Sequence, residues 1–260
     1  MAYRNILVER EDKIAIVTIN RPQVMNALSA ETLGELEQVV GELESAADVR
    51  AVIFTGAGDK AFVAGADLHE FPPTNAEEGR AAVERVQNLF FRIERMGKPV
   101  IMAINGFAVG GGCELAMAGD IRIASERAQL GQPEIDLGIL PGWGGTQRLP
   151  RLVGKGMAKY LIFSGERLSA QEAQRIGLVD FVVPPDELMA EAKALARKLA
   201  EKPRITMALA KKAIEEGLEV DLERGCVIEA AYFGLTCATQ DRIEGVNAFL
   251  EKRRPHFVDR

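Results

Sequence analysis

Short apolar runs and longer amphipathic segments alternate along the first two thirds of the chain. The apolar runs, which are typical of buried strands, occupy residues 14–19, 51–55, 100–104, 121–124 and 179–183. Helical spacing of apolar residues predicts helices after Ser29, at about 76–96, at about 150–163 and after Ser169, where S-x-x-E forms a capping box. The alternation indicates an α/β class, and it fits both a doubly wound sheet and a spiral of β-β-α units.

From about residue 187 the pattern contains helices alone. They are predicted at residues 188–202, 205–217, 222–239 and 243–252. We therefore divide the chain into a mixed core that carries the candidate chemistry, residues 1–186, and a helical region, residues 187–260. Pro72 and Pro73 predict an irregular excursion within the core.

The stretch 105–120, NGFAVGGGCELAMAGD, departs from the polar and apolar mixture elsewhere. Between Lys98 and Asp120 its one charged residue is Glu114, which follows three consecutive glycines in an apolar setting. Ionised carboxylates are rarely buried unless a partner pairs with them or their pKa moves. The glycines let backbone N–H groups approach another molecule closely, and they open a predicted helix. Amides and a carboxylic acid about one turn apart suit chemistry on a carbonyl group.

A second carboxylate and a second glycine loop have the same character. Glu134 lies in a long apolar, glycine-rich segment, and residues 64–66 (AGA) follow an apolar run. Each glutamate could instead be a structural acid or a surface residue, and each glycine loop a simple turn. Together they favour catalysis, because paired amides stabilise an oxyanion. Two neighbouring carboxyls resist ionising together, so one can hold a proton while the other accepts one.

Composition and charge exclude several other classes. The chain has 260 residues, of which 47% are hydrophobic and 27% charged, as is typical of a globular protein. Its net charge of −6 argues against non-specific nucleic-acid binding. The three cysteines lack disulfide or metal spacing, which fits a reducing compartment. With neither a secretory signal nor a long apolar run in sight, we predict a cytoplasmic protein with no membrane span.

Several familiar motifs are incomplete. Gly56-Ala57-Gly58 lacks the third glycine of a dinucleotide fingerprint, and Gly154-Lys155 lacks the rest of a P-loop. The only histidines, His69 and His256, are far apart in sequence, which argues against a Ser-His triad and a two-histidine metal site. We expect His69 to be structural or exposed to solvent, and we predict no metal site.

Four segments taken together resemble motifs of the crotonase, or enoyl-CoA hydratase, family. They are AFVAGADL, NGFAVGGGCELAMAGD, GQPEIDLGILPGWGGTQRLPRLVG and SAQEAQRIGLVD. They follow the family's order over essentially the whole chain, which closes with AFLEKRRPHF. The resemblance implies a spiral of β-β-α units and a C-terminal helical region that builds homotrimers, commonly paired into homohexamers.

The resemblance also assigns roles to individual residues. By matching position, the N–H groups of Ala66 and Gly111 would form an oxyanion hole for a thioester carbonyl. Glu114 and Glu134 match the two catalytic glutamates of the hydratases. The residues that match CoA-binding positions are Ala64, Gly65, Asp67, Leu68, Gly142 at a helix start and, from a neighbouring subunit, Lys252.

The implied activity is that of a hydro-lyase in fatty-acid β-oxidation or related acyl-CoA catabolism. Water held between Glu114 and Glu134 would add across the 2,3-double bond of a trans-2-enoyl-CoA to give a 3-hydroxyacyl-CoA. Glu114 would be the base that activates the water for attack on C3, and Glu134 would help to deliver a proton to C2. No cofactor is implied, since CoA arrives as part of the substrate thioester.

Other members of the family catalyse different reactions. Double-bond isomerases typically keep a glutamate at the position of Glu134 and lack the one at Glu114. Dienoyl isomerases and dehalogenases use an aspartate near Gly142 and Trp143, where this chain has no acid. A dehydratase of a specialised hydroxyacyl-CoA and a non-catalytic, RNA-binding scaffold remain as alternatives, and the acidic balance argues against the scaffold. Asp136 and Trp143 differ from many relatives, which leaves acyl length and branching open.

Overall fold

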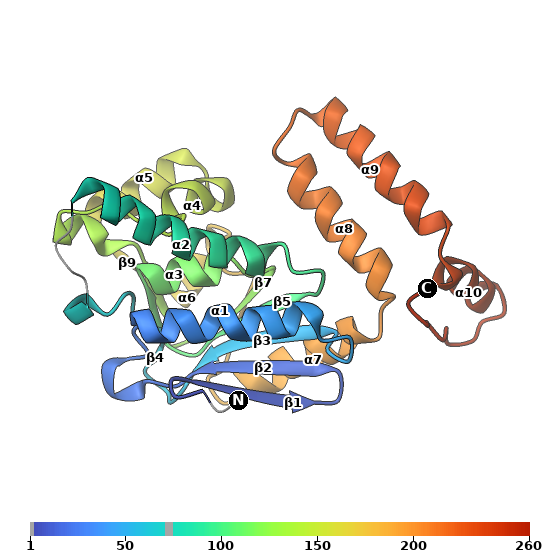
Figure 1. Ribbon diagram of the computed structural model, residues 1–260, viewed down its shortest axis with the longest axis horizontal. Helices are drawn as coiled ribbons and strands as arrows, with labels where there is room; N and C mark the ends of the chain where they lie inside the picture. The colour runs from blue at the N-terminus through green and yellow to red at the C-terminus, as the bar shows by residue number, and fades with distance from the viewer. Residues whose placement is uncertain (1–2, 71–74) are drawn as a thin grey trace.

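The structure, a computed structural model, describes residues 3–70 and 75–260, and its strands form two sheets (Figure 1). In spatial order the larger sheet contains β1 (Ile6–Glu11), β2 (Ile14–Ile19), β3 (Ala51–Gly56), β5 (Val100–Ile104), β7 (Ile121–Ser125) and β10 (Phe181–Val183). The smaller sheet contains β4 (Ala61–Val63), β6 (Phe107–Val109), β8 (Gln129–Gly131) and β9 (Arg167–Ser169). The excursion predicted at Pro72 and Pro73 falls outside the described residues.

Consecutive strands alternate between the two sheets. Strands β3, β5 and β7 are parallel neighbours in the larger sheet, and each is followed by β4, β6 or β8, parallel neighbours in the smaller one. Each pair leads into helical structure: α2 (Ala76–Glu94), α3 (Gly111–Met117), and the 3-10 helix η3 (Pro133–Leu137) followed by α4 (Gly145–Val153). This is the β-β-α spiral, so the prediction of that fold is confirmed and the doubly wound alternative is excluded.

The core lies on both faces of the larger sheet. Strands β3 and β5 are buried along their whole length, as continuous apolar runs predict for strands covered on both sides. Helix α1 (Ala30–Ser45) contributes Leu36 and Val40 to one layer, and its predicted cap is present because Ser29 accepts a bond from the Thr32 N–H at 3.1 Å. Helix α7 (Leu188–Ala200) covers the other face with small residues such as Ala192 and Ala196.

Two predicted elements differ from the structure. The single helix expected at about 150–163 is two helices, α4 and α5 (Lys155–Ser164), because Gly154 adopts φ +80° and ends the first. The apolar run that precedes the glycine loop at residues 64–66 is strand β4, which was not among the predicted strands. The strands of the smaller sheet are three residues long, too short to produce a periodic pattern. The capping box predicted at Ser169 is present and starts α6 (Ala170–Arg175).

The last three helices lie apart from the sheets. Helices α8 (Arg204–Gly217) and α9 (Leu222–Cys237) pack side by side and project from the core, and α10 (Gln240–Leu250) lies beyond them (Figure 1). Because α7 packs on the larger sheet, a division of the chain at residue 187 stays a prediction. In the part of the chain that the structure describes, no helix combines the length and apolar character that crossing a membrane requires.

Candidate active site

The N-terminus of α3 is the point at which the parts of the site meet. Three consecutive glycines there leave room for three different neighbours. A Cβ atom would lie 1.8 Å from the Val63 carbonyl oxygen at Gly112, 2.2 Å from the Trp143 indole at Gly111, and 3.2 Å from the Glu134 Oε1 at Gly110. Real Cβ atoms do not approach other atoms to 1.8 or 2.2 Å, so side chains at Gly112 and Gly111 would force these elements apart.

Glu114, in the first turn of α3, is only 2% exposed. Its Oε1 accepts hydrogen bonds from the N–H groups of Trp143 and Gly145, both at 2.7 Å. Gly145 is the first residue of α4, and Gly144 before it has no side chain to cap the helix. The Glu114 carboxylate therefore caps α4 from a distant part of the chain, where the helix dipole favours a negative charge.

Burial and the neighbouring groups of Glu114 shift its pKa in opposite directions. Burial raises its pKa from the ordinary value of 4.5 to about 7, although the Gly145 N–H lowers it. The Glu134 carboxylate raises the same pKa further, whereas the Trp143 N–H and the positive charge of Arg148 lower it. A carboxyl with a pKa near neutrality can both accept and release a proton under ordinary conditions, as a general base or acid must.

Glu134, in η3, is the second buried carboxyl, with 9% exposure. Burial raises its pKa to about 7 as well. Gln132 is 1% exposed, and with its amide nitrogen turned towards Glu134 it donates to Oε1 at 2.9 Å and to Oε2 at 3.2 Å. The two acids thus have similar proton affinities, and an amide side chain orients one of them.

The two backbone N–H groups predicted to form the oxyanion hole belong to Ala66, after β4, and to Gly111, at the start of α3. A parallel bridge pairs Leu28 with Ala66 and uses the Gly65 carbonyl and the Asp67 N–H, each at 2.9 Å, on either side of Ala66. Gly111 is the first residue of α3, where the N–H has no partner within the helix. Among the hydrogen bonds of the described residues, neither the Ala66 nor the Gly111 N–H has an acceptor.

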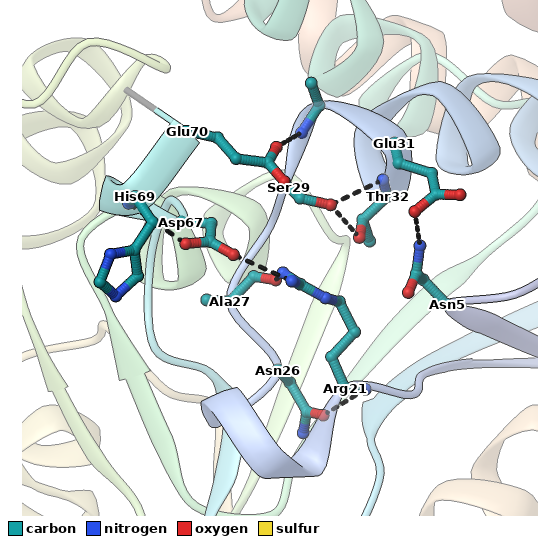
Figure 2. A network of polar contacts seen from close by, with 11 residues as sticks. Asn5, Arg21, Asn26, Ala27, Ser29, Glu31, Thr32, Asp67, His69 and Glu70 are labelled. Carbon is teal, nitrogen blue, oxygen red and sulfur yellow. Dashed lines mark hydrogen bonds and ion pairs between the residues drawn. The ribbon is translucent and has the colours of Figure 1, made fainter. Parts of the chain in front are cut away.

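A partly buried ion pair holds the loop that carries Ala66 (Figure 2). Arg21 donates to Asp67 Oδ2 at 2.9 Å and to the Ala27 carbonyl oxygen at 2.6 Å. The Arg21 bond lowers the pKa of Asp67, which keeps that carboxylate ionised. Glu70 accepts a bond from the Ala30 N–H at 2.9 Å and ties the loop to the start of α1. The Ala66 amide is therefore fixed by contacts on both sides of it.

Comparisons of sequence and of structure lead to one family. The profile described as "Enoyl-CoA hydratase/isomerase" matches residues 9–260. The chain belongs to the enoyl-CoA hydratase/isomerase family. It is 51% identical over 260 residues to the "Crotonyl-CoA hydratase" of Syntrophomonas wolfei, which covers 100% of both chains. It is 50% identical over 254 residues to the "Short-chain-enoyl-CoA hydratase" of Clostridium acetobutylicum, across 98% of this chain and 97% of that one.

A solved structure shows the same similarity in three dimensions. The crystal structure of an enoyl-CoA hydratase from Bacillus anthracis matches with a TM-score of 0.95 at 46% identity. The match covers 99% of this chain and 100% of the other. The hydratase/isomerase fold predicted from the motifs is thus confirmed.

In this member of the hydratase/isomerase family, the residues predicted to be catalytic come from three successive turns of the spiral. Ala66 follows β4, Gly111 and Glu114 belong to α3, and Glu134 belongs to η3. The structure brings these elements together through the contacts at the three glycines.

The residues predicted to bind CoA are more dispersed. Ala64, Gly65, Asp67 and Leu68 share the loop of Ala66, and Leu68 is 52% exposed. Gly142 precedes α4 and does not start it, because that helix begins at Gly145. Lys252 follows α10, which lies far from α3 within one chain (Figure 1). His69 lies next to the CoA loop and is exposed.

The sequence reasoning missed several residues that shape the site. They are Arg21, Gln132, Arg148 and the backbone amides of Trp143 and Gly145. Arg21 pairs with a residue 46 positions away, which no local pattern reveals. Arg148 did carry a signal, because it is a cation among the buried positions of α4, next to Leu149.

The burial of Glu114 predicts a pH-dependent loss of stability. Its pKa of about 7 in the folded state exceeds the ordinary 4.5, so between these values the folded state binds more protons than the unfolded state. The contribution of Glu114 to stability therefore falls as pH rises through this window, by about 3 kcal/mol. Glu114→Gln lacks this pH-dependent contribution. The difference in free energy of unfolding, variant minus wild type, should therefore increase by about that amount between pH 4.5 and pH 8.

Thermal or denaturant unfolding at the two pH values would measure this change. Glu126→Gln is the matched control, because Glu126 is exposed. Its difference from wild type should be nearly the same at both pH values. A Glu114→Gln difference that is equally independent of pH would contradict the raised pKa.

Proposed function

We propose that this chain adds water across the 2,3-double bond of a trans-2-enoyl-CoA to give a 3-hydroxyacyl-CoA. The observation that carries the proposal is the presence of two buried carboxyls, Glu114 and Glu134, with pKa values near neutrality. Hydration requires a base for the water and an acid for the carbon, and both are present in one site. The relatives named as hydratases support this assignment over double-bond isomerisation.

The two free amides supply the electrophilic half of the mechanism. The thioester carbonyl oxygen accepts hydrogen bonds from the N–H groups of Ala66 and Gly111, which withdraws electron density from C3. As water attacks, negative charge moves onto that oxygen, and preorganised N–H donors stabilise it without having to reorient.

The two acids supply the proton transfers. Glu114 is held by two amides that favour its ionised form, so we assign it the role of base. It takes a proton from water as the water oxygen bonds to C3. The C2=C3 electron pair shifts into the thioester to form an enolate, whose C2 is then ready to accept a proton. Protonated Glu134 then gives its proton to C2. A proton passing from Glu114 to Glu134, directly or through solvent, restores the starting state.

CoA needs no separate cofactor site in this proposal, because it enters as part of the substrate. Backbone groups of the loop that contains Ala64, Gly65, Asp67 and Leu68 hold its adenine and pantetheine portions. Gly142 lies close to the acyl end, and Lys252 of a neighbouring subunit approaches the CoA phosphates. The Asp67 side chain is engaged by Arg21, so it acts by shaping the loop.

Loss of the enoyl absorbance of crotonyl-CoA on incubation with the protein would test the activity. Glu114→Gln and Glu134→Gln should each lower kcat by about 10²–10⁴-fold, because each removes one proton-transfer group, while CoA-ester binding survives. Glu126→Gln should behave as wild type. Near-normal turnover in either active-site variant would contradict the role assigned to that residue, and no turnover of any enoyl-CoA by wild type would overturn the proposal.

We also propose that the site prefers short acyl chains. The Trp143 side chain is 9% exposed, lies against Gly111 and contacts Phe90 edge to face, with ring centroids 6.0 Å apart. An indole fixed beside the proposed oxyanion amide limits the space beyond the reacting carbons. Asp136, the other residue that differs from many relatives, is exposed, and its carboxylate lies near Gly165. The names of two relatives, for crotonyl and short-chain substrates, agree with this preference.

Truncation of the indole should therefore broaden the substrate range. Trp143→Ala should raise kcat/KM for 2-octenoyl-CoA relative to crotonyl-CoA by about tenfold or more, since each accommodated methylene is worth about that factor. Trp143→Phe should have a smaller effect, and Asp136→Asn should leave the ratio unchanged. An unchanged ratio in Trp143→Ala would show that another group sets the chain length.

A homotrimer or homohexamer is the proposed assembly. Helices α9 and α10 expose large apolar side chains, including Leu222 at 83%, Phe233 at 69% and Phe249 at 82%. Such surfaces are typical of protein interfaces. Light scattering at micromolar concentration should give three or six times the chain mass of 28.3 kDa. A mass of one chain would contradict this assembly.

A further inference from the structure

We propose that Arg148, anchored by Glu94, is a positioning residue for Glu114 because it fixes the loop whose amides hold the Glu114 carboxylate. The inference rests on the proposed function only in taking Glu114 as the base. Among the described hydrogen bonds Arg148 makes none to Glu114; it acts on the backbone between the two residues.

The Arg148 guanidinium connects α2 to this loop. It is 8% exposed, and its Nε and Nη2 donate to the two carboxylate oxygens of Glu94 at 3.1 and 2.9 Å. Its Nη1 donates to the Trp143 carbonyl oxygen at 3.2 Å, and its central carbon lies 5.0 Å from the Phe91 ring centroid. The planar guanidinium is bound on three sides and has little freedom to move. The ammonium group of a lysine could not reproduce this set of contacts.

The loop and the guanidinium fit closely. Gly144 adopts φ +111°, which favours glycine, and a Cβ there would lie 2.1 Å from Arg148 Nη1. Trp143 is therefore held from both sides: its carbonyl oxygen accepts from Arg148, and its N–H donates to Glu114. If the Arg148 contact is lost, the loop can rotate, and the two hydrogen bonds from its backbone N–H groups to Glu114 lengthen.

Arg148 also contributes charge. A positive charge near a carboxylate favours its ionised form, and Arg148 lowers the pKa of Glu114 whereas Glu134 raises it. The other charged groups that line the cleft beside Arg148 are Glu94, Lys98, Asp120, Arg122, Arg151, Lys211, Glu215 and Glu219. Lys211 pairs with Asp120 and Arg151 with Glu219. Arg148 itself pairs with Glu94.

The chain contains a matched control three positions away. Arg151 is on the same helix and forms an ion pair with Glu219 at 3.2 Å, but its side chain is 57% exposed. Arg151→Met removes the same charge and a similar volume from α4 without touching the loop. A comparison of Arg148→Met with Arg151→Met therefore separates the loop contact from general effects on the helix.

The decisive experiment is the pH profile of kcat/KM for crotonyl-CoA. Arg148→Met should lower kcat by about 10- to 100-fold with little change in KM, since misplacing a catalytic group costs about this much. Its acidic limb should move to higher pH by about half a unit to one unit, because Glu114 loses a stabilising cation and two well-aligned amides. Arg151→Met should match wild type in both respects. Glu94→Gln should move the profile in the same direction as Arg148→Met, by less, and Arg148→Lys should recover part of the shift.

An unchanged acidic limb in Arg148→Met, with only a lower melting temperature, would show that Arg148 is a structural support and would overturn the proposal. If Arg148→Met does not fold, Glu94→Gln and Arg148→Lys carry the same test. If wild type lacks hydratase activity, unfolding still decides the matter. Arg148→Met should steepen the loss of stability between pH 4.5 and pH 8, and Glu114→Gln in the same chain should abolish that effect; an effect that persists without Glu114 would overturn the proposal.

Discussion

The hydrogen bonds from two backbone amides to one buried carboxylate are the contact on which the rest of the site depends. The Glu114 carboxylate would be too costly to bury without them, and α4 would begin without a cap at Gly144. The contact thus serves folding and, in the proposed mechanism, also catalysis. Because the amides lower the pKa of Glu114 while burial raises it, this pKa stays near 7, and the carboxyl can still ionise at neutral pH.

Two arginines, the partly buried Arg21 and the buried Arg148, support the two halves of the site in the same way. Arg21 joins the Asp67 carboxylate to the Ala27 carbonyl oxygen and fixes the loop with the Ala66 amide. Arg148 joins the Glu94 carboxylate to the Trp143 carbonyl oxygen and fixes the loop around Glu114. In both cases one planar guanidinium binds a carboxylate and a backbone carbonyl oxygen at once, which fixes the orientation of the main chain relative to a side chain.

The sequence predicted most of the larger sheet and pointed to the two carboxyls that the structure buries, but it predicted little of what holds them. Continuous apolar runs revealed β2, β3 and β5, since both of their faces are buried, and the isolated charge of Glu114 marked it among apolar residues. The strands of the smaller sheet escaped because three residues carry no period. The helix start at Gly145 escaped because its cap, Glu114, is 31 positions away. Contacts of that range depend on the assembled spiral, and the family motifs supplied them only by resemblance.

The parts of the site lie on successive turns of the spiral, so they are synthesised one after another. A ribosome that has released the chain as far as β7 has already made Ala66, Gly111 and Glu114. The amides of Trp143 and Gly145, the acid Glu134 and the guanidinium of Arg148 do not yet exist in that nascent chain. Without the N–H groups of Trp143 and Gly145, Glu114 is an ordinary hydrated carboxylate. In the proposed mechanism, a prematurely terminated chain would therefore be inactive, and activity would not increase stepwise with each added turn of the spiral.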